Sequence, residues 1–171
     1  IFRHVLNRGQ DMVTVGSELE FLQNYILIMQ ARFGNRIKVR VEAEDGLLEY
    51  PIPKLLIQPL VENAILHGIE PKQEGGMILV RVSRREEKME ISVEDNGVGA
   101  DEKQIKIRMN EHSQFQDTFA LCNIDERIKL RYGKDYGLRF ESQMGAGCRV
   151  TLTLPVTKEE GRDEDTSDDR R

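Results

Sequence analysis

The first strong pattern along the chain is helical. Apolar side chains recur at spacings of three and four residues, which predicts a helix with one apolar face that continues to about Arg32. Ser17 and Glu20 have the spacing of a capping box, so we expect this helix to begin at Ser17, and Gly34 supplies its stop signal. The apolar face consists of Leu19, Leu22, Ile26 and Met29.

A second helix is predicted after Pro53, a residue that is favourable in a first turn. Its apolar stripe repeats with a helical period and ends at Gly68. Pro59 lies within the stripe and removes one backbone hydrogen bond, so we expect either a kink or a place in the first turn. The stripe consists of Leu56, Ile57, Leu60, Val61 and Ala64.

Other segments alternate between apolar and polar side chains, which is the period of a half-buried strand. The strands are expected at 37–41, 77–83, 89–94, 138–142 and 148–154. A third helix is expected at 121–132 and a long polar loop at 100–118. Because single strands alternate with helices and the other strands form hairpins, we predict an α/β two-layer sandwich, a mixed β-sheet with helices packed on one face.

The charge balance narrows the classes of partner. Among 171 residues there are 25 Lys and Arg against 30 Asp and Glu, a net charge of −5. Much of this excess lies in the acidic segment 157–171, for which we expect disorder. A chain without a basic excess lacks the electrostatic attraction that drives broad nucleic-acid binding, so no nucleic-acid partner is expected.

The cysteines and histidines do not form a recognisable metal or disulfide pattern. Cys122 and Cys148 make no CxxC pair, and the three histidines have no zinc-site spacing. The sequence also contains no run of 18 apolar residues, so we expect no membrane contact by this segment. Because the chain opens in mid-pattern without Met, we interpret it as a segment of a longer protein.

Two polar side chains on the second predicted helix are candidate ligand contacts. Asn63 and His67 lie four residues apart and therefore share one face of a helix. An amide and an imidazole placed in this way can point at one ligand. A capped helix end with His67 at the surface is the alternative interpretation.

Glycines next to a strand end form a second candidate site. Asp95 ends a predicted strand and is followed by Gly97 and Gly99, so its carboxylate could accept a hydrogen bond while the backbone approaches a planar ligand such as a purine. A simple turn explains the same residues equally well. Gly145 and Gly147 precede the last strand, where a hairpin turn is again the alternative. Neither pair continues as a P-loop or a Rossmann fingerprint.

The order of these motifs resembles the histidine-kinase, gyrase and chaperone-type ATPase superfamily, which implies a Bergerat-type ATP-binding fold. Three longer segments, Tyr25–Gly34, Pro53–Gly68 and Asn123–Gly133, resemble the YesM and LytS type of bacterial sensor histidine kinase. The resemblance covers residues 1–156. It implies ATP and Mg²⁺ as cofactors.

The resemblance also implies roles for individual residues. The amide oxygen of Asn63 would hold the Mg²⁺ that bridges the ATP phosphates, and His67 would lie near those phosphates. Asp95 would accept the adenine amino group, with Gly97 and Gly99 clearing space for the base. The other implied nucleotide contacts are Gly68, Leu121, Asn123, Arg127, Gly145, Gly147 and Cys148, the last in place of the family's Thr.

The likeness to the family also bears on the type of reaction. Hydrolysing relatives carry a water-activating Glu four residues before the Asn, and here that position is Pro59. This favours transfer to a side chain over hydrolysis. Glu62 is the candidate catalytic residue, as a polariser. The helix that carries the phosphate-accepting histidine in the family is absent from this sequence, and His4 lies outside its usual context.

We therefore expect a kinase domain that works with segments outside this chain. Residues 1–35 would end the dimerisation region, and 36–156 would form the ATP-binding domain. The γ-phosphoryl of ATP would pass to a histidine of the missing dimerisation helix and then to a response regulator. The expected setting is a homodimer, as the cytoplasmic part of a bacterial membrane sensor.

Three alternatives remain open at this point. The family's glycines before the last helix are replaced in Thr118–Leu121, so the chain could be a degenerate module that acts in dimerisation without catalysis. The other two are a self-contained ATPase and a serine-directed kinase of the anti-sigma type. Pro59 disfavours the former, and the contexts of Arg32–Gly34 and Gln58–Leu60 fit the latter less well.

Overall fold

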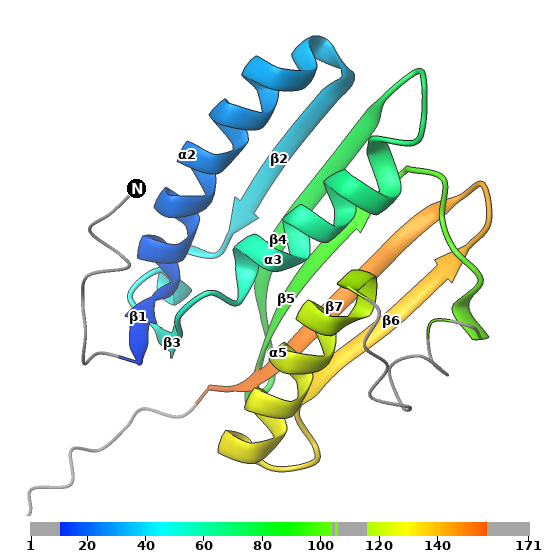
Figure 1. Ribbon diagram of the computed structural model, residues 1–171. Helices are drawn as coiled ribbons and strands as arrows, with labels where there is room; N and C mark the ends of the chain where they lie inside the picture. The colour runs from blue at the N-terminus through cyan, green and yellow to red at the C-terminus, as the bar shows by residue number, and fades with distance from the viewer. Residues whose placement is uncertain (1–10, 104, 106–115, 157–171) are drawn as a thin grey trace, which may run out of the picture.

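The computed structural model describes residues 11–103, 105 and 116–156, and of 116–119 the backbone alone. Three long helical segments lie across one face of a five-stranded sheet, which gives two layers (Figure 1). The predicted two-layer α/β sandwich is therefore confirmed. The elements are β1 Met12–Thr14, α2 Val15–Phe33, β2 Ile37–Ala43, β3 Pro51–Pro53, α3 Ile57–Asn63, β4 Gly76–Arg85, β5 Lys88–Asp95, α5 Gln116–Tyr132, β6 Gly137–Gln143 and β7 Gly147–Pro155, with 3-10 turns at Gly34–Arg36 and Asp45–Leu47 and a π-helical turn at Ala64–Ile69.

The sheet is mixed, as its sequence pattern predicts. The strand order is β2-β4-β5-β7-β6; β2 runs parallel to β4 and every other neighbouring pair is antiparallel. The hairpin of β4 and β5 turns through only Glu86 and Glu87, so both strands are longer than the alternation alone indicates. This topology places the last residue of β5 next to the start of β7 at one end of the strands, with Asp95 opposite Cys148.

The predicted start of the first helix is wrong. The N-cap is Thr14, whose Oγ1 accepts a hydrogen bond from the Ser17 N–H at 3.1 Å, so the helix starts three residues earlier than Ser17. The cause is a short antiparallel pairing of β1 with β3, which delivers the chain to Thr14 in an extended conformation. Val15 is then fully buried in the first turn.

One apolar core joins the two layers. The buried face of α2 contains Leu19, Leu22 and Ile26, as the periodicity predicts, and these residues belong to the same cluster as the inner face of the sheet. Pro59 is the third residue of α3, a first-turn position where the missing N–H costs no intrahelical bond. Within the described residues, no helix is long and apolar enough to cross a membrane.

Candidate functional site

The site forms around Asp95, the last residue of β5. Its side chain is 5% exposed, and the N–H of Gly97 donates to Oδ1 at 2.8 Å. Burial raises the pKa of this carboxyl above its usual value, and the backbone N–H groups of Gly97 and Cys148 only partly counter that effect. Asp95 is thus a hydrogen-bond acceptor held in poorly solvated surroundings.

Glycines allow the helix end to meet the strand end. A Cβ on Gly68 would lie 2.5 Å from Asp95 Oδ1, and a Cβ on Gly97 would overlap the Gly68 carbonyl. The Val98 N–H donates to that same carbonyl at 2.9 Å. These two glycines are therefore required by packing between the π-helical turn and the loop after β5.

Packing also requires glycine at positions 99 and 147, near the same end of β5. Gly99 has φ +65°, and a Cβ there would overlap the Gln143 carbonyl. Gly147 has φ +99°, and a Cβ there would overlap the Asp95 carbonyl. Both glycines are therefore in close contact with neighbouring backbone and leave no room for a side chain.

The helix that follows β3 supplies two polar side chains, Asn63 and His67, which form the polar rim of a pocket beside Asp95. Asn63 is the last residue of α3 and His67 lies in the π-helical turn, where the Glu70 N–H donates to the Ile65 carbonyl at 2.8 Å. Both side chains line the same pocket as Asp95, which confirms that they share a face. Turns of this π type occur often at functional sites.

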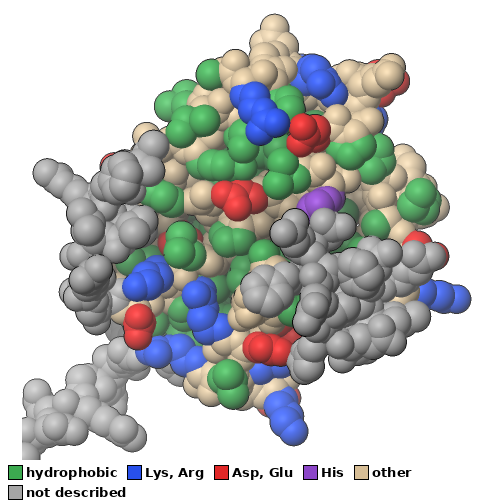
Figure 2. Space-filling view, in the orientation of Figure 1, with side chains coloured by type: hydrophobic (Ala, Val, Ile, Leu, Met, Phe, Trp, Pro, Cys, Tyr) green, Lys and Arg blue, Asp and Glu red, His purple; other side chains and the backbone are tan. Residues whose placement is uncertain are grey.

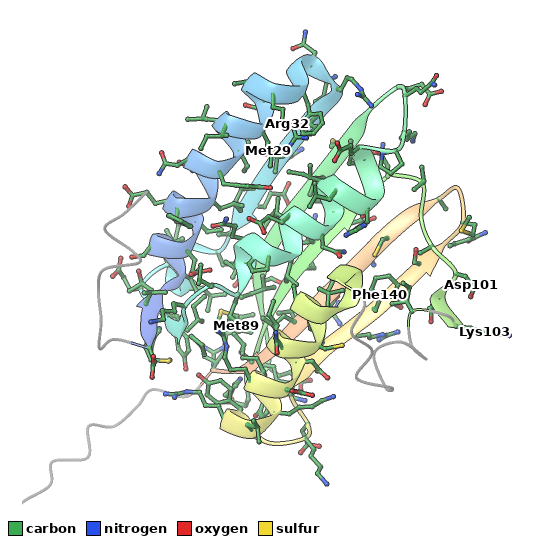
Figure 3. All side chains as sticks on the ribbon, viewed as in Figure 1. Met29, Arg32, Met89, Asp101, Lys103 and Phe140 are labelled. Atoms are coloured by element: carbon green, nitrogen blue, oxygen red, sulfur yellow. The ribbon has the colours of Figure 1, made fainter. Side chains whose placement is uncertain are left out.

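The resulting pocket has a volume of about 180 Å³. It is lined by Asn63, His67, Gly68, Asp95, Gly99, Ala100, Ile105, Leu121, Phe140 and Cys148. In Figure 3, Phe140 lies beside the N-terminal half of α5, and Asp101 lies farther out on the segment after β5. A buried carboxylate, an amide and an imidazole thus share a pocket whose remaining walls are mainly apolar.

Cys148 lies beside Asp95 and also lines the pocket. The two residues are register partners on β7 and β5. Burial, together with the nearby charge of Asp95, raises the pKa of the Cys148 thiol to about 12. At neutral pH the side chain is therefore a neutral thiol.

Four predicted site residues lie elsewhere. Gln58 Nε2 donates to Glu62 Oε1 at 2.6 Å, and Glu62 is not part of the pocket lining. Asn123 and Arg127 line a separate hollow between α5 and the start of α3. Gly145 has φ +78° and turns the chain between β6 and β7, where its N–H donates to the Val98 carbonyl at 2.7 Å. The structure gives none of these four a place beside Asp95.

Sequence reasoning missed several residues of this region. The wall residues Ala100, Ile105 and Phe140 were not predicted; only Phe140 had a signal, because its alternation with neighbours on a strand points it inward. Glu18 was also missed: it is 1% exposed and accepts backbone N–H groups at the start of α3. Its burial could not be predicted locally, because it depends on the start of α3 packing against α2.

Some predictions fall on residues that the structure does not describe. These are His4, most of the loop 100–118 and the acidic segment 157–171. Leu121, the last residue of the glycine-poor segment Thr118–Leu121, is 2% exposed and lines the pocket. In the described part of the chain, no group of three His, Cys, Asp or Glu residues could hold a metal ion by itself.

Comparison with known families identifies two matching segments. Residues 50–158 match the family described as "Histidine kinase-, DNA gyrase B-, and HSP90-like ATPase". Residues 1–37 match the family described as "Histidine kinase". The second match ends at the first residue of β2 and so includes all of α2.

Curated relatives are identical to this chain at about a third of the aligned positions. It is 33% identical over 159 residues to the sensor histidine kinase YesM of Bacillus subtilis, which covers 93% of this chain and 26% of YesM. It is 32% identical over 151 residues to the sensor protein LytS of Oceanobacillus iheyensis, covering 86% of this chain and 26% of LytS. The chain thus spans about a quarter of the length of these relatives.

Solved structures share the fold at lower identity. The catalytic domain of histidine kinase ThkA superposes with a TM-score of 0.62 at 18% identity, covering 87% of this chain and 100% of that one. ThkA in complex with the response regulator TrrA gives a TM-score of 0.62 at 19% identity, covering 88% of this chain and 42% of that one. A blue-light activated histidine kinase of Erythrobacter litoralis EL346 also gives 0.62 at 19% identity, covering 84% and 42%.

Proposed function

The chain belongs to the histidine kinase-, DNA gyrase B- and HSP90-like ATPase family, and from that premise we propose that its Asp95 pocket binds ATP with Mg²⁺ for phosphoryl transfer to a histidine. The acceptor histidine would lie on a dimerisation helix outside this chain, and a response regulator would receive the phosphoryl group next. One observation carries the proposal: a buried carboxylate forms part of a pocket with mainly apolar walls.

The base half of the pocket suits a purine that carries an amino group. An ionised Asp95 is an acceptor only, so it selects a donor such as an exocyclic amine. Leu121, Ile105 and Phe140 offer apolar contact to a flat ring. A buried acceptor left without a donor is costly, so a ring without the amino group would bind much more weakly.

The rim suits the phosphate half of the same ligand. Asn63 offers an amide oxygen, which is an acceptable Mg²⁺ ligand, and His67 lies close by on the rim. Because no three-residue metal cluster exists among the described residues, these groups fit a cation held jointly with nucleotide phosphates rather than by the protein alone. When bound, Mg²⁺ would neutralise charge on the phosphates.

Transfer is favoured over hydrolysis by the residues around α3. Pro59 occupies the position where hydrolysing relatives carry a water-activating Glu. Glu62, the candidate polariser, is engaged by Gln58 at 2.6 Å and lies outside the pocket lining. With no carboxylate of α3 placed to activate water at the pocket, the chain's own task is to bind and position the nucleotide.

The test is a phosphotransfer assay on the full-length protein with γ-labelled ATP. We expect label on the protein, with the acid-labile and base-stable behaviour of phosphohistidine, and passage of that label to a response regulator. Asp95→Asn should remove the label while the protein stays folded. Steady release of free phosphate without labelled protein would contradict a transfer function.

A second function, dimerisation and signalling without catalysis, is motivated by the glycine-poor segment Thr118–Leu121. In the structure this segment already lies inside α5. Helical backbone has less freedom than a glycine hinge to close over a ligand. If the second function is correct, the native chain should not bind nucleotide, and glycine at positions 118 and 120 should restore binding.

The wider setting follows the same premise. The relatives that match the chain are named as sensor proteins, so we propose that this domain works as a homodimer on the cytoplasmic side of a bacterial membrane sensor. Chemical cross-linking of the full-length protein tests the dimer.

A further inference from the structure

The loop between β3 and α3 is held from one side by a carboxylate of α2. Glu18 Oε1 accepts the Leu55 N–H at 2.6 Å, and Oε2 accepts the N–H groups of Leu56 and Ile57 at 3.1 and 3.2 Å. Glu18 is 1% exposed, so these charge-assisted bonds are shielded from water. One side chain thereby satisfies the N–H groups of Leu56 and Ile57, which have no intrahelical partner at the start of α3.

A guanidinium of α5 holds the same loop from the other side. Arg127 Nη2 donates to the Lys54 carbonyl at 2.7 Å and approaches the Leu55 carbonyl at 3.4 Å. Burial lowers the pKa of Arg127, and the charges of Glu18 and Asp11 counter that effect. Figure 2 shows Lys and Arg side chains gathered on this part of the face.

The clamped loop contains a strained residue. Leu55 has φ +59°, the left-handed region that a leucine rarely adopts, and its side chain is 43% exposed. This conformation brings Cβ too close to the neighbouring carbonyl oxygen and is therefore disfavoured for a leucine. A residue of this kind persists only where surrounding contacts fix it, and here the contacts are the bonds to Glu18 and Arg127.

The strained loop leads directly into the polar rim of the pocket. From Ile57 the chain runs through α3 to Asn63 and then through the π-helical turn that holds His67. At the far end, Gly68 packs against Asp95. The start of α3 therefore contributes to where Asn63 and His67 lie, while the backbone of Asp95 is held by the pairing of β5 with β7.

We propose that Glu18 and Arg127 are positioning residues that act through the Leu55 loop to hold Asn63 and His67 at the pocket. The inference rests on the proposed nucleotide site. Under this proposal, α2 and α5 both contact the loop at the start of α3. Helix α2 belongs to the segment that matches the histidine kinase family, and α5 carries the wall residue Leu121. A shift of α2 would then change the phosphate end of the pocket before the base end, whereas α5 also contributes Leu121 to the base end directly.

The test separates these two ends of the ligand. Calorimetry on the chain would measure the affinity for adenosine, and the affinity for a non-hydrolysable ATP analogue with and without Mg²⁺. The variants are Glu18→Gln, Arg127→Met and the double variant. Gln retains the shape of Glu18, but its NH₂ group would face a backbone N–H and cannot accept a bond from it.

Matched controls perturb the same two helices without touching the loop bonds. Leu22→Ala lies on the same helix as Glu18 and opens an apolar cavity, since Leu22 is fully buried. Asp125→Asn lies on the same helix as Arg127; Asp125 accepts the Leu138 N–H at 2.8 Å and so ties α5 to β6 rather than to the loop.

We expect the Mg²⁺-dependent gain in analogue affinity to fall about tenfold in each single loop variant, with the double variant close to either single one. Adenosine affinity should stay within about twofold, because Asp95 is untouched, and the controls should keep the Mg²⁺ dependence. Equal losses for adenosine and analogue, or an unchanged Mg²⁺ dependence, would overturn the positioning role.

Amide hydrogen exchange distinguishes this failure from failure of the proposed function. If the native chain binds no nucleotide, the proposed site is wrong, and the positioning role at that site is wrong with it. The clamp itself predicts faster exchange in residues 57–69 for both loop variants, selectively over the strands of the sheet. Exchange in 57–69 that matches the controls would contradict the clamp.

Discussion

Gly68 lies against the carboxylate of Asp95, so closely that a methyl group on Gly68 would meet Oδ1 at 2.5 Å and Cγ at 2.8 Å. This contact joins the end of the helical layer to the end of β5. Because only a hydrogen atom fits between them, the carboxylate, the amide and the imidazole can line one pocket.

Gly68→Ala should therefore damage both the pocket and the fold. We expect a loss of about 1–3 kcal/mol in the free energy of unfolding, together with a loss of nucleotide affinity, since Asp95 must move. Gly46→Ala is the matched control, because nothing lies within 4 Å of its Cβ and its φ is not left-handed. Urea unfolding and calorimetry measure the two effects; equal behaviour of the two variants would contradict the packing argument.

The raised pKa of Asp95 predicts how nucleotide affinity depends on pH. Protonation removes an acceptor from the site, so affinity should fall as pH drops, with a midpoint above the ordinary value of 3.8. Calorimetry with adenosine, which carries no phosphate to titrate, measures this midpoint. A midpoint at or below 3.8 would show that burial does not govern the group.

The same pKa predicts the stability of Asp95→Asn. The folded chain takes up this proton at a higher pH than the unfolded chain, so the carboxylate lowers the free energy of unfolding at pH values above its folded pKa, and the deficit disappears as pH falls to 3.8 and below. Asp95→Asn removes the buried charge, so at pH 7 it should be at least as stable as the native chain. Urea unfolding at pH 7 and pH 4 checks this; a large destabilisation at pH 7 would be contrary to it.

Glu86 offers a stability prediction far from the site. It is the first of two turn residues between β4 and β5, is exposed, and has φ +54°. Glycine adopts this conformation without the steric cost, so Glu86→Gly should raise the free energy of unfolding by about 1 kcal/mol. Glu87→Gly, at the neighbouring turn residue without a left-handed φ, is the control and should not be stabilising.

Cys148 should be a slow thiol. With a pKa of about 12, only about one molecule in 10⁴ carries the reactive thiolate at pH 8. In a Cys122→Ser background, the reaction with a thiol reagent should be far slower in the folded chain than in urea. Similar rates in the two states would show that the thiol is neither buried nor shifted.

Local patterns were sufficient for the layers of the fold. The two-residue period of the strands and the helical stripes each record one buried face, so the five-stranded sheet and its helices were predictable. The start of α2 was not, because Thr14 becomes the cap only when β1 pairs with β3, nearly 40 residues away in sequence. The pairing of segments that lie far apart in the sequence cannot be predicted from local patterns of hydrophobic and polar residues.

The site divides in the same way. Asp95, Asn63 and His67 were predictable, because each lies at an element end that the pattern locates. Arg127 was assigned to the nucleotide from the resemblance, yet its guanidinium binds the carbonyls of the loop before α3. Glu18 has no local signal of burial, and only tertiary packing shows that it is buried.

The central claim, that the Asp95 pocket is a nucleotide site, is tested most directly by titrating the chain with a non-hydrolysable ATP analogue and Mg²⁺ in a calorimeter, beside Asp95→Asn and Asn63→Ala. The account predicts saturable binding by the native chain, none by folded Asp95→Asn, and binding that no longer depends on Mg²⁺ in Asn63→Ala. Absence of binding by the native chain at millimolar nucleotide, or unchanged binding by Asp95→Asn, would contradict it.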